Sequence, residues 1–138
     1  MADLKSLIKL HKHELDGKRQ ILAQLYEDLA LLNQQREAVI KKIKEEQEAI
    51  TKTSDVHFTF ANFIEKGKQQ VLKIEEHMNV LEAQVVVAKD EMMACFSELK
   101  KYEMTQEERE ALEAEENRMK ELQELDEIAL EGFRRKEE

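Results

Sequence analysis

The chain is poor in the residues that interrupt helices and in those that fill compact cores. Its 138 residues include no proline, no tryptophan and three glycines, and aromatic residues make up 5% of the total. Because proline and glycine are the strongest helix breakers, their scarcity permits long uninterrupted helices. A charged fraction of 38% is typical of elongated helical proteins rather than of a compact globule. We therefore predict an all-α chain without a sheet.

Cysteine and long apolar runs are also scarce. The single cysteine, Cys95, cannot form an internal disulfide and falls on an apolar helical face, which indicates a small buried side chain rather than a nucleophile. No apolar run approaches the length of a membrane span, and the N-terminus lacks the apolar core of a secretory signal. We expect a cytoplasmic chain with no direct membrane insertion.

Motifs that carry catalysis are missing as well. The sequence has no glycine-rich phosphate loop, no nucleophile elbow and no cysteine pair for zinc. None of the four histidines follows a glutamate by three residues, which excludes the Glu-x-x-His pairs of di-iron bundles. His11 and His13 are two residues apart and so point to different helix faces. We predict no enzymatic activity, no cofactor and no metal.

The net charge of −9 is unevenly distributed. Residues 103–138 contain six basic and fourteen acidic residues, a net charge of −8. Nucleic-acid binding requires a basic face that neutralises phosphates, so we do not expect it. The acidic segment suits either a basic protein partner or a solvated helix.

Two long apolar seams follow the heptad spacing of coiled coils, in steps of three and four residues. The first seam consists of Ile8, His11, Leu15, Lys18, Leu22, Leu25, Leu29, Leu32, Arg36, Val39, Ile43, Glu46 and Ile50. The second consists of Ile64, Gly67, Val71, Ile74, Met78, Leu81, Val85, Ala88, Met92, Cys95, Leu99 and Tyr102. They predict one helix over about residues 3–52 and another over about 59–135. The tip between them, about 53–58, is short, so the helices should pack as an antiparallel coiled-coil hairpin.

Helix caps and charges refine this hairpin. The candidate N-caps of the second helix are Ser54 and Asp55, with Thr53 and Thr59 as alternatives. If the hairpin pivots near residue 55, facing positions sum to about 110. Three opposite charges then face each other across the seam: Lys18 with Glu91, Arg36 with Glu75, and Glu46 with Lys66.

The same register predicts where the hairpin ends. Leu4 faces Gln106, and beyond this point the apolar spacing of the second helix changes phase. Residues 107–138, here called the arm, should therefore project past the first helix. An amphipathic arm with Leu125, Ile128 and Phe133 on one side leaves apolar surface in water unless it meets a partner.

Three of the five phenylalanines cluster beside the tip, at positions 58, 60 and 63. One or two of Phe58, Phe60 and Phe63 can pack over the end of the first helix. Two helices offer too little surface for all three rings, so we expect at least one to remain exposed as a binding anchor. The cluster is predicted to be both structural and partner-binding.

These features resemble the FliJ family of flagellar export proteins and their injectisome counterparts, the stalk family. The resemblance covers nearly the whole chain: the opening segment 4–12, the aromatic tip, the run Leu125-Asp126-Glu127-Ile128-Ala129, and Arg134-Arg135. It implies a non-catalytic stalk of the type III export apparatus that binds the hexameric export ATPase, the export gate membrane protein and export chaperones. Through these partners the chain could lie at the cytoplasmic face of the inner membrane.

The resemblance also implies two groups of partner-binding residues. Those on the gate side, near the tip, are Phe58, Phe60, Phe63 and Gln69. Those on the ATPase ring side, in the arm, are Leu125, Asp126, Glu127, Ile128, Phe133, Arg134 and Arg135.

The alternative is a homodimeric coiled-coil scaffold or a prefoldin-like holdase, since both use the same seams. A prefoldin-like chain needs strands between its helices, and residues 51–58 are too few to supply them. A parallel dimer of this chain would be about twice as long as a hairpin, because the rise per helical residue is fixed.

Overall fold

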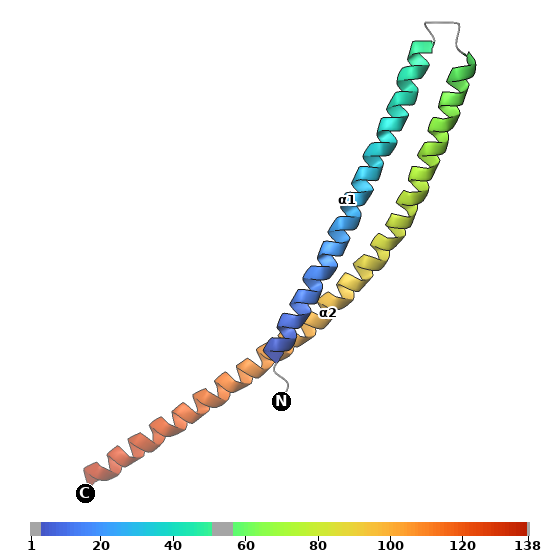
Figure 1. The fold of residues 1–138 in the computed structure, drawn as a ribbon. Helices are drawn as coiled ribbons and strands as arrows, with labels where there is room; N and C mark the ends of the chain where they lie inside the picture. The colour runs from blue at the N-terminus through green and yellow to red at the C-terminus, as the bar shows by residue number, and fades with distance from the viewer. Residues whose placement is uncertain (1–3, 51–56, 138) are drawn as a thin grey trace. The chain divides into compact units, whose positions relative to one another are not determined.

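The computed structural model describes residues 4–50 and 57–137, and all of them lie in two α-helices. Helix α1 spans Leu4–Ile50 and helix α2 spans His57–Glu137 (Figure 1). The predicted all-α hairpin is confirmed. Most of the predicted tip, with the candidate caps Thr53, Ser54 and Asp55, lies outside the described residues. Thr59 lies inside α2 and does not cap it, because the helix already includes His57.

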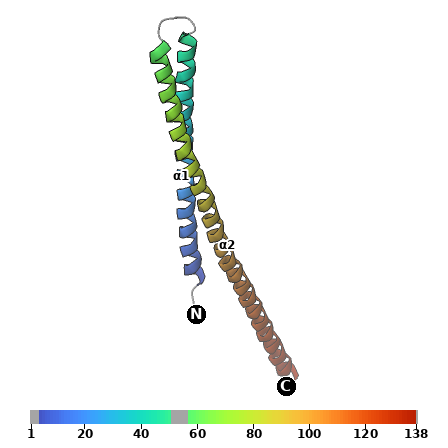
Figure 2. The same cartoon turned by 90° about the vertical axis from the view of Figure 1, so that its right-hand side faces the viewer.

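The chain forms two compact units. The hairpin body comprises Glu14–Ala94 and contains most of α1 with the first part of α2. The terminal unit comprises Met1–His13 and Cys95–Glu138. In the hairpin body, α1 and α2 run side by side in opposite directions (Figures 1 and 2).

Ion pairs across the hairpin body confirm the predicted register. Lys18 Nζ lies 3.1 Å from Glu91 Oε2, and Arg36 Nη1 lies 4.0 Å from Glu75 Oε1. The third predicted pair, Glu46 with Lys66, is not among the ion pairs of the described residues, and Glu46 is exposed. Exposed pairs contribute only about 0.2–1 kcal/mol each, so these charges select the register more than they stabilise the fold.

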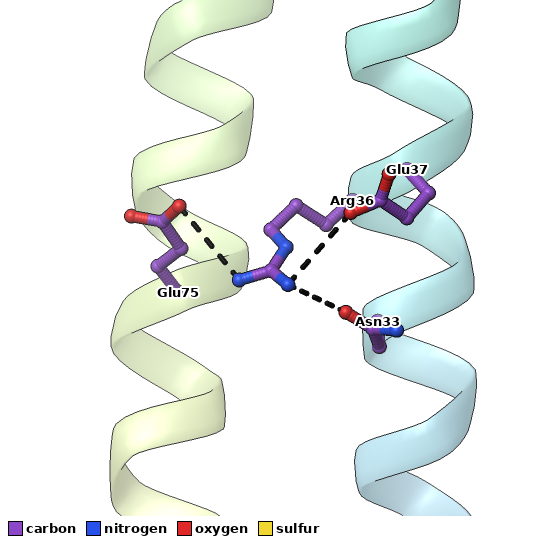
Figure 3. A network of polar contacts seen from close by, with 4 residues as sticks. All are labelled: Asn33, Arg36, Glu37 and Glu75. Atoms are coloured by element: carbon purple, nitrogen blue, oxygen red, sulfur yellow. Dashed lines mark hydrogen bonds and ion pairs between the residues drawn. The ribbon is translucent and has the colours of Figure 1, made fainter.

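Arg36 makes the more elaborate of the two cross-helix contacts. Its side chain extends from α1 toward α2 (Figure 3), and it is less exposed than that of Lys18. The Nη2 group donates a hydrogen bond to Asn33 Oδ1 at 2.6 Å and lies 3.8 Å from Glu37 Oε1. The guanidinium therefore occupies a seam position, and Glu37 and Glu75 compensate its charge.

The apolar seams form the core of the hairpin body. Leu22, Val85 and Ala88 are buried together, and the half-buried side chains of Leu25, Leu29 and Met92 pack against them. Leu15 and Leu81 are also buried. Each fully buried aliphatic side chain contributes about 1.5–3 kcal/mol relative to exposure, so this packing dominates over the ion pairs.

Gly67 is the one buried glycine in the described helices, and it lets α2 approach α1 closely. A Cβ built at Gly67 would lie 2.7 Å from Ile43 Cδ1 and 3.0 Å from Ile43 Cγ1. These distances are below van der Waals contact, so any side chain here displaces Ile43. The gap in the second seam is therefore filled from α1.

In the terminal unit, the start of α1 packs on α2 through Leu4 and Leu99, which are both buried. The rings of His11 and Tyr102 stack with centroids 4.9 Å apart. The half-buried Cys95 is a free thiol, and its Sγ donates to the carbonyl oxygen of His11 at 3.8 Å. These contacts hold the first turns of α1 against α2.

Beyond Gln106, no other helix of the described residues covers α2. Gln106 is half-buried, whereas residues 107–136 are all exposed. Local contacts support this segment: Gln106 Nε2 donates to Glu110 Oε1 at 3.0 Å, and Arg118 Nη2 donates to Glu115 Oε1 at the same distance. Pairs three or four residues apart stabilise a helix by about 0.2–0.5 kcal/mol each. The second helix thus projects beyond the first, as predicted.

The close approach at Gly67 generates a stability prediction with an internal control. Gly17→Ala should raise the free energy of unfolding by about 1 kcal/mol, because alanine is the better helix former and a Cβ at Gly17 meets no atom within 4 Å. Gly67→Ala should raise the free energy of unfolding by less than Gly17→Ala does, or should lower it, because the new Cβ meets Ile43. Urea unfolding followed by circular dichroism measures both. Equal gains for the two variants would contradict the close packing.

Candidate protein-binding surfaces

No group of three or more His, Cys, Asp or Glu within residues 4–50 and 57–137 is arranged to hold a metal ion. Neither helix, over the same residues, contains a stretch long and apolar enough to cross a membrane. The surfaces that stand out are instead apolar and exposed, which is typical of protein-binding sites.

The first surface is a groove of about 400 Å³ on one flank of the hairpin body, here called the Phe63 groove. Phe63 is 39% exposed and forms part of its wall. The complete lining is Ala38, Val39, Lys42, Ile43, Phe63, Lys66, Gly67 and Gln70. An exposed aromatic ring beside apolar side chains, with two lysines at the rim, can anchor an apolar segment that carries negative charge.

The gate-side residues predicted from the sequence are only partly brought together here. Phe63 lines the groove, and Phe60 is half-buried in the first turns of α2. Gln69 is exposed but is not among the lining residues. The side chain of Phe58 lies outside those the structure describes.

Sequence reasoning missed the rest of the Phe63 groove, although a signal for it exists. Lys42, Phe63 and Gln70 each directly precede a seam residue, namely Ile43, Ile64 and Val71. In a heptad this position lies beside the seam, where side chains of the two helices meet on one flank. Gly67 belongs to the groove because Ile43 packs against its backbone, and this contact depends on three-dimensional packing.

The second surface is the arm, which lies in the terminal unit. Each of its large apolar side chains is between 53% and 66% exposed. These residues are Leu112, Met119, Leu122, Leu125, Ile128, Leu130 and Phe133. Leu122, Leu125, Ala129 and Phe133 are spaced by three and four residues, so they form one stripe along the helix. A contiguous apolar stripe without a covering element indicates an interaction site.

The predicted ring-side residues all lie on this exposed arm. Asp126, Glu127, Arg134 and Arg135 are exposed, as are Leu125, Ile128 and Phe133. Arg134 and Arg135 stand with Lys136 in the last turn of α2, where cations interact favourably with the helix dipole. Leu130 was missed, although it precedes Phe133 by one helical turn.

Comparison with known proteins gives one clear result. The chain matches the family described as Flagellar FliJ protein over residues 2–138, which is essentially its whole length. No curated protein and no solved structure was found to match it.

Because the apolar side chains of the arm are exposed, replacing one of them should leave the fold intact. Leu125→Ser should change the free energy of unfolding by less than about 0.5 kcal/mol, because Leu125 is 61% exposed. The matched change Leu99→Ser, at a side chain that is 4% exposed, should cost at least about 2 kcal/mol. Thermal and urea unfolding test the pair. A comparable loss in both variants would show that the arm packs within the folded chain.

Proposed function

Because the chain belongs to the FliJ family and is thus a component of the flagellar protein export apparatus, we propose that it acts as a non-catalytic stalk between two partners. The arm binds the hexameric export ATPase, and the tip-proximal part of the hairpin body binds the cytoplasmic domain of the export gate membrane protein. The chain works in the cytoplasm and also receives export chaperones.

The observation that carries this proposal is the uncovered apolar stripe of the arm. Leu125, Ile128 and Phe133 are each more than half exposed in a helix that no other described element covers. Burying such side chains at an interface contributes about 1.5–3 kcal/mol each, which is enough for a few anchors to hold a complex. A single helix fits between neighbouring subunits of a ring, where it contacts both.

Binding between subunits suggests how the arm acts on the ATPase. A helix that contacts two neighbours stabilises their association and favours the conformations in which both contacts form. The chain would therefore promote ring assembly and turnover without taking part in the chemistry. The acidic character of the arm predicts a basic lining of its binding site on the ring.

The Phe63 groove supports the gate side of the proposal. It combines an exposed aromatic ring with Lys42 and Lys66. The groove belongs to the hairpin body, whereas the arm belongs to the terminal unit. An apolar segment with acidic residues suits this groove. The two partners would then bind different residues of one chain.

The proposal predicts how the cognate flagellar export ATPase responds to the chain. Its hydrolysis rate should rise with the concentration of intact chain, and the rise should be lost in the full-length variant Leu125→Ser/Phe133→Ser and in a chain that ends at residue 106. The reason is that both changes remove the apolar anchors of the arm. Circular dichroism verifies that the variants remain helical.

The matched control is Phe60→Ala/Phe63→Ala, which alters the hairpin body and leaves the arm intact. This variant should still stimulate the ATPase but should bind the cytoplasmic domain of the gate protein more weakly. Loss of stimulation in the control, or no stimulation by folded intact chain, would favour a scaffold or holdase role.

A further inference from the structure

The hairpin body has a second apolar groove, on the opposite flank from the Phe63 groove. Its volume is about 450 Å³, and its lining consists of Ile40, Ile43, Lys44, Gln47, Lys68, Val71 and Leu72. Ile40 and Lys68 directly follow the seam residues Val39 and Gly67. Residues that follow the seam lie on the flank opposite to those that precede it. This surface is here called the Leu72 groove.

The Leu72 groove is apolar at its centre and positive at its rim. Leu72 is 58% exposed and Ile40 is 39% exposed. Lys44 projects from α1 and Lys68 from α2, and no carboxylate is among the lining residues. The acidic residues of the surrounding turns, which are not among the lining residues, are Glu37, Glu45, Glu46, Glu48, Glu65, Glu75 and Glu76. The groove therefore fits an apolar helix that carries negative charges beside its apolar stripe.

The arm of this same protein has that chemistry. Its stripe includes Leu122 and Leu125. The exposed Glu121 directly precedes Leu122, and the exposed Asp126 directly follows Leu125. Flanking positions of this kind form the ion pairs between helices of coiled coils. Residues 103–138 carry a net charge of −8, so this segment is attracted electrostatically to a groove with lysines at its rim.

The contact requires two molecules. Leu72 and Leu125 belong to the same continuous α-helix, and a continuous helix does not contact itself. We infer that the arm of one copy docks in the Leu72 groove of a second copy, with Leu122 and Leu125 on Ile40 and Leu72 and the acids of the arm on Lys44 and Lys68. The occupied groove is a small interface, so the association is weak and sensitive to salt.

This inference goes beyond the export function and needs no other protein. It has one functional consequence: an arm that occupies a groove cannot bind the ATPase at the same time. The chain alone suffices to test it, so failure here leaves the ATPase proposal untouched.

The test is a charge exchange followed by sedimentation velocity of the full-length chain. The intact chain should sediment faster with rising concentration at low salt, and should return to the monomer value at high salt. Lys44→Glu/Lys68→Glu and Glu121→Lys/Asp126→Lys should each weaken the association about tenfold or more, because like charges then face each other. An equimolar mixture of the two variants should associate again, because the unchanged arm of the first variant meets the unchanged groove of the second, and the reversed groove meets the reversed arm.

A matched control carries the same change in total charge away from the groove. Lys9→Glu/Lys12→Glu alters two exposed lysines of the terminal unit and should associate like the intact chain. A monomeric intact chain at every concentration would overturn the inference. So would a mixture that fails to associate although each variant is helical, since another surface or another partner would then cover the groove.

Discussion

The antiparallel packing of the α1 seam on the α2 seam is the interaction on which the rest of the structure depends. Leu22, Val85 and Ala88 are buried at this contact, while the cross-helix ion pairs remain partly exposed. Apolar burial therefore stabilises the hairpin, and the pairs of Lys18 and Arg36 select one register among those that the heptads allow. Once the register is fixed, the end of the paired region is fixed as well.

Because the two helices differ in length, this register leaves one part of α2 paired with α1 and another part unpaired. Helix α1 has 47 residues and α2 has 81, so a long part of α2 has no counterpart among the described residues to pack against. The residues of that part keep helical geometry through local pairs such as Arg118 with Glu115. Its apolar side chains are therefore available to other proteins, whereas those of the seams are not. The residues that hold the hairpin together are therefore distinct from the exposed apolar residues of the arm.

Much of this arrangement could be predicted from the sequence because a two-helix coiled coil has few degrees of freedom. The spacing of the seams identified which side chains are covered, and charge matching placed Lys18 beside Glu91 and Arg36 beside Glu75. The expected pair of Glu46 with Lys66 is not among the ion pairs of the described residues, and Glu46 is exposed near the end of α1. Pairs near a helix end have fewer apolar neighbours to hold them in place.

The grooves could not be predicted from spacing alone. Their shape depends on side chains beside the seam and on local helix separation, which Gly67 reduces by admitting Ile43. Leu130 lies outside the three-four series that runs through Leu125 and Phe133, so that series does not identify it. For the aromatic cluster, the sequence suggested a tip-side surface, and the structure adds the groove in which Phe63 participates.

The central claim is that one chain holds two partners at separate sites. The most direct measurement is analytical ultracentrifugation of the labelled chain with saturating export ATPase and the cytoplasmic domain of the gate protein, each alone and then together. The account predicts a ternary species that sediments faster than either binary complex. Displacement of one partner by the other, with no ternary species, would contradict it.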